Sequence, residues 1–162
     1  MDFKSFTDDA RIWIYGFDRT LSEHEKIIAD ELLNKFVRDW KSHGSPVRAQ
    51  YALTCNRFAI LAVSAEDVIS GCSIDSSIKI FKDLKEKLGV NALDVNLVFY
   101  RTGQEIRSTN RLEFQNMIDR GAIGQETMVF DTTIQTLGDL RSGKFERPLS
   151  TSWHARVFSL SA

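Results

Sequence analysis

VRAQYALTCNRFAILAVS, residues 47–64, is the stretch that decides the fold. Two mostly apolar runs, 47–54 and 57–64, flank Cys55 and Asn56. Runs of this length, bounded by turn residues, indicate β-strands. Asn tolerates the left-handed backbone conformation that a tight hairpin demands. The stretch therefore predicts two antiparallel strands joined around Cys55 and Asn56.

A strand and a helix are expected before this hairpin. Residues 11–17 alternate apolar with small or polar residues and include β-branched and aromatic side chains, which predicts a strand. Ser22 and Glu25 have the spacing of a capping box and open a helical pattern that should stop at Gly44. The apolar positions of this helix recur at i, i+4 spacing: Ile28, Leu32, Phe36 and Trp40.

A second helix and a fourth strand follow the hairpin. The apolar face of the helix consists of Ile74, Ile78, Phe81, Leu84 and Leu88. Gly89 ends the helical pattern, and residues 95–101 predict the next strand. The order β-α-β-β-α-β is that of the ferredoxin-like fold, an antiparallel sheet with both helices on one face. We therefore expect an α+β protein with a ferredoxin-like core in residues 1–102.

Residues 103–162 are expected to form a C-terminal α/β extension. Local patterns predict a hairpin strand at 104–108, a helix at 110–121, a strand at 127–130 and a short helix at 136–143. Ser152 is expected to cap a terminal helix. The extension has too little apolar content for an independent core. It should therefore pack on residues 1–102 and form one structural unit with them.

Composition excludes several classes of function. The net charge is -1 and the pI is near 6.3, so an excess of Lys and Arg for binding a phosphate backbone is missing, and nucleic-acid binding is disfavoured. No apolar run approaches a membrane span, and the first residues lack the apolar segment of a signal peptide, so we expect a cytoplasmic protein. Two cysteines make no disulfide framework. The three histidines lie far apart, so neither a metal site nor a cofactor is expected.

The helix entrance at residues 70–77, SGCSIDSS, is the first candidate for a functional site. A helix N-terminus offers free N–H groups and the positive end of the helix dipole, which together can bind phosphate or carboxylate. The sequence therefore predicts a small-anion site. Its expected residues are Gly71, Cys72, Ser73, Asp75 and Ser76, assisted by Arg57 or Arg101.

Two other interpretations of the helix entrance stay open. In the first it is only a helix start, because Ser73 or Asp75 is a good N-cap and the Asp75 carboxylate competes with an anion for the same N–H groups. In the second the protein is a thiol enzyme. The helix field would then lower the pKa of the Cys72 thiol, and His154 would serve as the base. Their spacing in the sequence does not show that Cys72 and His154 meet.

Residues 138–145, GDLRSGKF, match the front of a P-loop, G-x-x-x-x-G-K. Phe145 stands where Ser or Thr must hold magnesium, and Pro148 follows where a long helix should run. We therefore interpret this segment as a short helix that stops at a glycine.

Five short stretches carry a resemblance that runs nearly from end to end: 11–15, 56–58, 70–75, 127–130 and 152–154. In these stretches (RIWIY, NRF, SGCSID, TMVF and SWH) the chain resembles a small bacterial family of uncharacterised proteins that are often labelled "ABC transporter ATPase". The label implies ATP hydrolysis. The incomplete P-loop and the missing L-S-G-G-Q signature disfavour that activity, so the resemblance supplies no mechanism.

Taken together, these patterns favour a non-enzymatic binding or interaction module with a small-anion site at residues 71–77. The alternative is a thiol enzyme with Cys72 as the nucleophile. Sheets of this class often associate through an open face, so a homodimer through a sheet face is the expected assembly by analogy with the fold.

Overall fold

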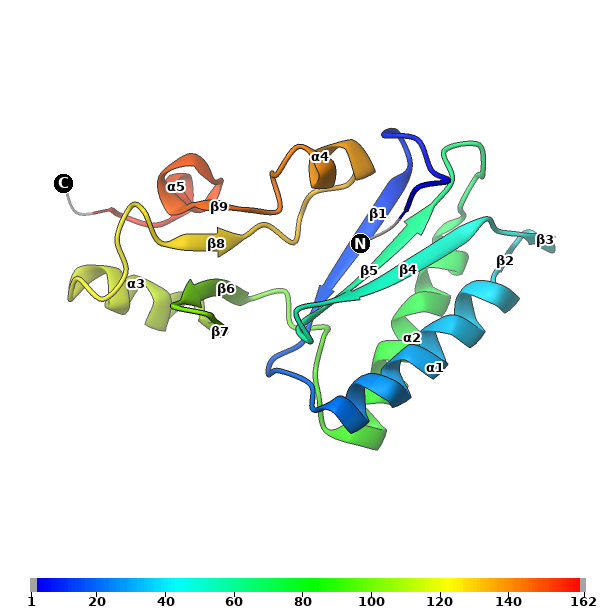
Figure 1. Ribbon diagram of the computed structural model, residues 1–162, viewed down its shortest axis with the longest axis horizontal. Coiled ribbons are helices and arrows are strands. Elements are labelled where there is room, and N and C mark those ends of the chain that lie inside the picture. Colours follow the sequence, from blue (N-terminus) through cyan, green and yellow to red (C-terminus); the bar gives the residue numbers. More distant parts are fainter. Residues whose placement is uncertain (1–2, 161–162) are drawn as a thin grey trace.

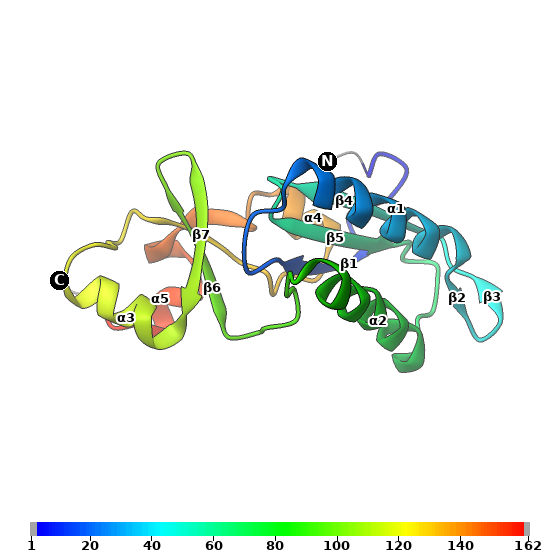
Figure 2. The same cartoon turned by 90° about the horizontal axis from the view of Figure 1, so that it is seen from below.

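The computed structural model describes residues 3–160, with the exception of the side chain of Cys72. This part of the chain forms an α+β fold with three antiparallel sheets and five α-helices (Figure 1). The two larger sheets lie side by side along the long axis of the molecule, and α1 and α2 cover the outer face of one of them (Figures 1 and 2). The predicted α+β class is confirmed.

The first sheet contains the predicted hairpin. It has the order β1-β5-β4, formed by β1 (Arg11–Gly16), β4 (Ala49–Thr54) and β5 (Phe58–Val63). Cys55 and Asn56 adopt φ angles of 56° and 49°, so the left-handed turn is where the sequence indicates it. Every residue of β5 is buried, which explains why this strand is a continuous apolar run rather than an alternating one.

Two long helices cover one face of this sheet. The first is α1 (Glu23–Asp39), whose predicted capping box between Ser22 and Glu25 is confirmed, and the second is α2 (Gly71–Leu88), which ends at Gly89 with a φ of 66°. The helix α1 stops before Gly44, contrary to expectation. The chain instead makes a small hairpin of β2 (Lys41–Ser42) and β3 (Ser45–Pro46), with Gly44 at a φ of 80° in its turn.

The fourth expected strand does not join the first sheet. This strand, β6 (Leu97–Thr102), lies in a second sheet of order β7-β6-β8-β9. Its sheet partners are β7 (Glu105–Asn110), β8 (Met128–Phe130) and β9 (Glu146–Pro148). The ferredoxin-like topology is therefore not established, since β6 has neighbours on both sides elsewhere and leaves the edge of β1 without it. The strand contacts β1 through Phe99, whose ring lies against Gly16.

The face of the first sheet that α1 and α2 leave open is covered by side chains from residues 3–10, from residues 134–137 and from the adjoining end of the second sheet. A shared core lies between the two sheets, in which the Phe58 ring meets the rings of Phe99, Phe130 and Phe145 at centroid distances of 5.0–5.1 Å. Side chains of the described residues fill this face, and the expected homodimer stays a prediction.

The remaining elements follow the predicted extension closely. They are α3 (Arg111–Asp119), α4 (Leu137–Arg141), a 3-10 turn at Leu149–Thr151 and α5 (His154–Val157). The predicted helix at 136–143 and strand at 127–130 are confirmed by α4 and β8, whereas β9 and the 3-10 turn have no counterpart in the prediction. The N-cap of α5 is Trp153 rather than Ser152.

Candidate ligand-binding site

The predicted helix entrance is capped by its own side chains. The N-cap is Ser70, not Ser73 or Asp75, and its hydroxyl accepts a hydrogen bond from the Ser73 N–H at 3.3 Å. The Ser73 hydroxyl donates to the Lys41 carbonyl at 3.0 Å, and the Ser70 N–H donates to the hydroxyl of Ser42 at 3.2 Å. These bonds fasten the start of α2 to the β2–β3 hairpin, as the helix-start interpretation requires.

Gly71, Asp75 and Ser76 lie on the exposed side of this first turn, whereas Ser73 is buried. Cys72 belongs to α2 by its backbone, but its side chain lies outside the described part of the structure. The small-anion site and the reactivity of the Cys72 thiol therefore stay predictions.

Arg57 is buried and holds the hairpin end in place. Its guanidinium donates to the carbonyls of Phe17, Asp18 and Ile106 at 2.9, 3.1 and 2.8 Å. Hydroxyl groups on Thr20 and Ser108 accept further hydrogen bonds from it. Burial lowers the pKa of Arg57, and no carboxylate pairs with it directly among the described residues. This arginine ties the first sheet to β7.

Arg101 lies in the same seam between the two sheets. It donates to Glu146 at 2.5 Å, which raises the pKa of Arg101, and it lies 5.4 Å from the centre of the Phe130 ring. Arg57 immediately precedes β5, whereas Val63, the last residue of β5, packs with Ile69 near the start of α2. Both arginines thus lie near the first residue of β5, whereas the helix entrance lies near its last residue. The structure does not bring the arginines to the predicted anion site.

His154 belongs to a different core. It is 1% exposed, its Nδ1 shares a hydrogen bond of 2.8 Å with the Ser152 hydroxyl, and its ring stacks on Trp153 with a centroid distance of 3.9 Å. Burial lowers the pKa of His154 to about 4. Its helix, α5, lies at one end of the molecule, whereas the β2–β3 hairpin that contacts the start of α2 lies at the other (Figures 1 and 2). The structure does not bring His154 and the helix entrance together.

The segment that matches the front of a P-loop is a short helix that stops at a glycine, as predicted. Gly143 has a φ of 79°, Lys144 pairs with Asp139 at 2.7 Å, and Phe145 is buried in the core between the sheets.

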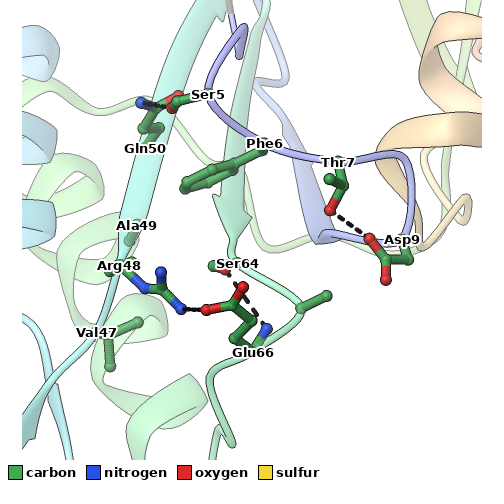
Figure 3. Close-up of a pocket in the computed structure, with 11 residues that line it drawn as sticks. Ser5, Phe6, Thr7, Asp9, Val47, Arg48, Ala49, Gln50, Ser64 and Glu66 are labelled. Carbon is green, nitrogen blue, oxygen red and sulfur yellow. Dashed lines mark hydrogen bonds and ion pairs between the residues drawn. The ribbon is translucent and has the colours of Figure 1, made fainter.

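A polar hollow of about 730 Å³ lies between residues 5–9 and the start of β4. Figure 3 shows the Phe6 ring at its centre, with Gln50 bonded to Ser5 on one side and Arg48 paired with Glu66 on the other. Its charged groups are thus largely engaged with one another, and Gln50 Oε1, which is buried without a hydrogen-bond partner, does not by itself select one ligand chemistry.

The unoccupied edge of β1 offers a different kind of site. The N–H of Phe17 donates to the Arg57 carbonyl at 2.9 Å, which fixes the alternation of the ladder between β1 and β5. Ile12, Ile14 and Gly16 therefore direct their N–H and C=O groups away from β5. The Ile12 N–H confirms this direction, because it donates to the Gln135 carbonyl at 2.9 Å. Beyond the bridge between Arg11 and Thr136, β1 has no strand partner on this side among the described residues.

A cavity of about 440 Å³ lies along this edge. The helix α2 forms one wall with Ile74 and Ile78, and β6 forms the other with Leu97 and Phe99. The remaining lining residues come from β1 and from two loops: Trp13, Ile14, Tyr15, Gly16, Ala92, Leu93, Asp94, Val95 and Thr132. The walls are mostly apolar, which is typical of a ligand-binding pocket.

Tyr15 holds the α2 wall in position. Its ring stacks on Phe81 with a centroid distance of 3.9 Å, and its hydroxyl lies 3.0 Å from the Ser77 hydroxyl. Burial raises the pKa of Tyr15, so this group is neutral at physiological pH. A smaller hollow of about 220 Å³ continues along β1 toward Arg11, between the strand and residues 132–135.

Sequence reasoning missed this cavity because it assigned the edge of β1 to a fourth strand. Searches for protein families, curated proteins and solved structures find no match to the chain. Within residues 3–160, no helix is long and apolar enough to cross a membrane. The described side chains likewise include no cluster of three or more His, Cys, Asp or Glu residues able to hold a metal ion.

Proposed function

We propose that the protein is a non-enzymatic binding module that holds an elongated apolar ligand in the cavity beside β1. The observation that supports this most directly is the open edge of β1 between two apolar walls, one from α2 and one from β6. Apolar cavities with a few polar groups that fix orientation are the usual form of ligand sites.

The chemistry of the lining favours binding over catalysis. Among the described lining residues, Asp94 and Tyr15 carry the ionisable side chains. The Tyr15 hydroxyl is engaged with Ser77, and Asp94 accepts a hydrogen bond from the Asn96 N–H at 2.9 Å. General acid–base or nucleophilic catalysis needs a positioned pair of reactive groups, which this lining does not supply.

The proposal is tested with a neutral apolar probe, N-phenyl-1-naphthylamine, whose fluorescence rises in apolar surroundings. Val95 lines the cavity and is 85% exposed, whereas Val68 is 83% exposed and lies outside that lining. Val95→Glu and Val68→Glu are therefore a matched pair that should leave the fold intact. A desolvated charge at the cavity costs binding free energy.

We expect the natural protein and Val68→Glu to bind the probe with equal affinity, and Val95→Glu to bind it at least about tenfold more weakly, equivalent to about 1.4 kcal/mol. Equal binding by all three proteins, or no binding by the natural protein, would contradict the proposed site.

A further inference from the structure

The ligand of this cavity is of a definite chemical class. We propose that it is an extended apolar peptide segment that adds to β1 as a further strand through main-chain hydrogen bonds. This inference rests on the proposed binding function and specifies what is bound.

The main-chain groups of β1 carry the argument. Ile14 directs its N–H and C=O into the side of the strand that faces away from β5, and neither group has a hydrogen-bond partner among the described residues. The C=O of Ile12 and the N–H of Gly16 point the same way without a partner in that part of the chain. Unpaired N–H and C=O groups along a strand edge are the template on which an added strand forms.

An apolar ligand without amide groups would bind the cavity more weakly than a peptide strand that forms the same apolar contacts. It would displace water from Ile14 and leave its N–H and C=O unsatisfied, and burying unpaired polar groups costs free energy. A peptide strand offers an acceptor and a donor at the spacing of the ladder, so it fills the apolar space and satisfies the edge at the same time.

The two walls determine which peptide fits. Successive side chains of a strand point to opposite faces, so one set would meet Ile74 and Ile78 of α2 and the other would meet Leu97 and Phe99 of β6. Both faces of the added strand would therefore be apolar. The expected segment is a continuous run of Val, Ile, Leu or Phe rather than an alternating one.

The fold itself supplies the position of the added strand. The segment at residues 135–136 already lies antiparallel to β1 at its first residues, and from Trp13 to Gly16 the strand continues beyond it without a partner on this side among the described residues. An added strand would extend this line, in the position that a ferredoxin-like sheet gives to its fourth strand.

The second open edge of this sheet is a less suitable acceptor. On β4, the N–H of Ser64 donates to the Arg48 carbonyl, so Ala49, Tyr51 and Leu53 direct their main-chain groups away from β5. The hollow in Figure 3 touches only Ala49 and Gln50 of this strand, and charged side chains line it. Peptide addition should therefore favour β1 over β4.

The experiment uses the peptide acetyl-Lys-Val-Ile-Val-Ile-Val-Lys-amide and a control with the same side chains that is N-methylated at its three central residues. N-methylation removes the donors of the added strand and keeps its apolar surface. Amide hydrogen exchange, read by NMR for Ile14, Gly16, Tyr51 and Leu53, reports which edge is covered.

We expect the first peptide to slow exchange at Ile14 at least tenfold and to leave Tyr51 and Leu53 unchanged, and the N-methylated control to bind at least tenfold more weakly. Equal binding of both peptides, or protection of Tyr51 and Leu53 instead of Ile14, overturns strand addition at β1. Probe binding that Val95→Glu weakens, without binding of either peptide, overturns the peptide inference and leaves the proposed function standing. If neither the probe nor the peptides bind, both fail.

Discussion

Replacing Gly16 with alanine should lower the stability of the fold, because the Phe99 ring occupies the space of a side chain at this position. A Cβ atom on Gly16 would lie 2.6 Å from Cε2 of Phe99 and closer still to Cζ. Carbon atoms in contact prefer separations of about 3.5–4.0 Å, so the ring must retreat by about 1 Å or more.

The ring has little room to retreat. Phe58 meets it edge-on with a centroid distance of 5.1 Å, and the Arg57 guanidinium lies 5.8 Å from its centre. Overpacking of a filled core costs about 1–3 kcal/mol, and we expect Gly16→Ala to lie at the upper end of this range. For a chain of this size such a loss lowers Tm by about 5–10 °C.

Urea unfolding followed by circular dichroism measures the change. Gly71→Ala is the matched control, because a Cβ atom there meets nothing within 4 Å and the residue lies in the first turn of α2. It should be neutral or stabilising by about 0.5–1 kcal/mol. The double variant Gly16→Ala with Phe99→Leu should show a coupling energy of at least about 1 kcal/mol. A Gly16→Ala cost below about 0.5 kcal/mol that adds to that of Phe99→Leu would refute the close packing of the Phe99 ring on Gly16.

Two further predictions concern the buried polar groups. Arg57→Met leaves the buried carbonyls of Phe17 and Ile106 without their donor and should lower the free energy of unfolding by about 3 kcal/mol or more. Arg101→Met removes only a partly exposed ion pair with Glu146 and should lower it by about 1 kcal/mol. Urea unfolding measures both losses, and the reverse order would contradict the roles assigned to the two arginines. His154 has a folded-state pKa of about 4, below its unfolded value of about 6.5, so its contribution to stability is complete above pH 6.5 and is lost as the pH falls toward 4. The free energy of unfolding should therefore fall by about 1–3 kcal/mol across this window. Urea unfolding at several pH values should show a weaker dependence of this free energy on pH for His154→Phe than for the natural protein. An equal dependence in both proteins would show that another group causes it.

The order of the elements was predictable because its signals are local. The capping box of Ser22 and Glu25, the left-handed turn at Cys55 and Asn56, and the glycine after α2 each satisfy their chemistry within a few residues. Such signals act whatever the rest of the chain does. They therefore predict β1, the start of α1, β4, β5 and α2 without any knowledge of how the elements meet, although the end of α1 and the β2–β3 hairpin were missed.

The pairing of β6 was not predictable from the same signals, because it is a choice between distant partners. The chain turns at Gly103, with a φ of 59°, and β7 pairs with β6 along its whole length, so the nearby partner closes only a short loop. The other edge of β6 then pairs with β8. The order of the elements along the chain does not predict this pairing or its register. One local sign of the outcome was present, since a glycine at the end of an apolar strand, here Gly16, often marks the close approach of another part of the chain.

The candidate sites show the same difference between local features, which the sequence predicts, and contacts between distant residues, which it does not. The residues singled out at the helix entrance have distinctive side chains, and the structure uses Ser70 and Ser73 to fasten α2 to the β2–β3 hairpin. The cavity beside β1 has no distinctive side chains, because its decisive groups are the N–H and C=O of Ile14. Main-chain groups form a binding site only where no other strand pairs with them, and the sequence does not show which groups stay unpaired.

Phe99 links the stability of the fold to ligand binding, because its ring packs on Gly16 and also forms part of the cavity wall. Gly16→Ala should therefore weaken binding of the naphthylamine probe even where the variant is fully folded, since the displaced ring changes the cavity. Phe114→Leu offers the comparison, because Phe114 is fully buried in the core around α3 and lies outside the cavity lining. It should lower the free energy of unfolding and leave the affinity for the probe unchanged. If both variants bind the probe as the natural protein does, Phe99 does not shape the site, and the β6 wall must be assigned to Leu97.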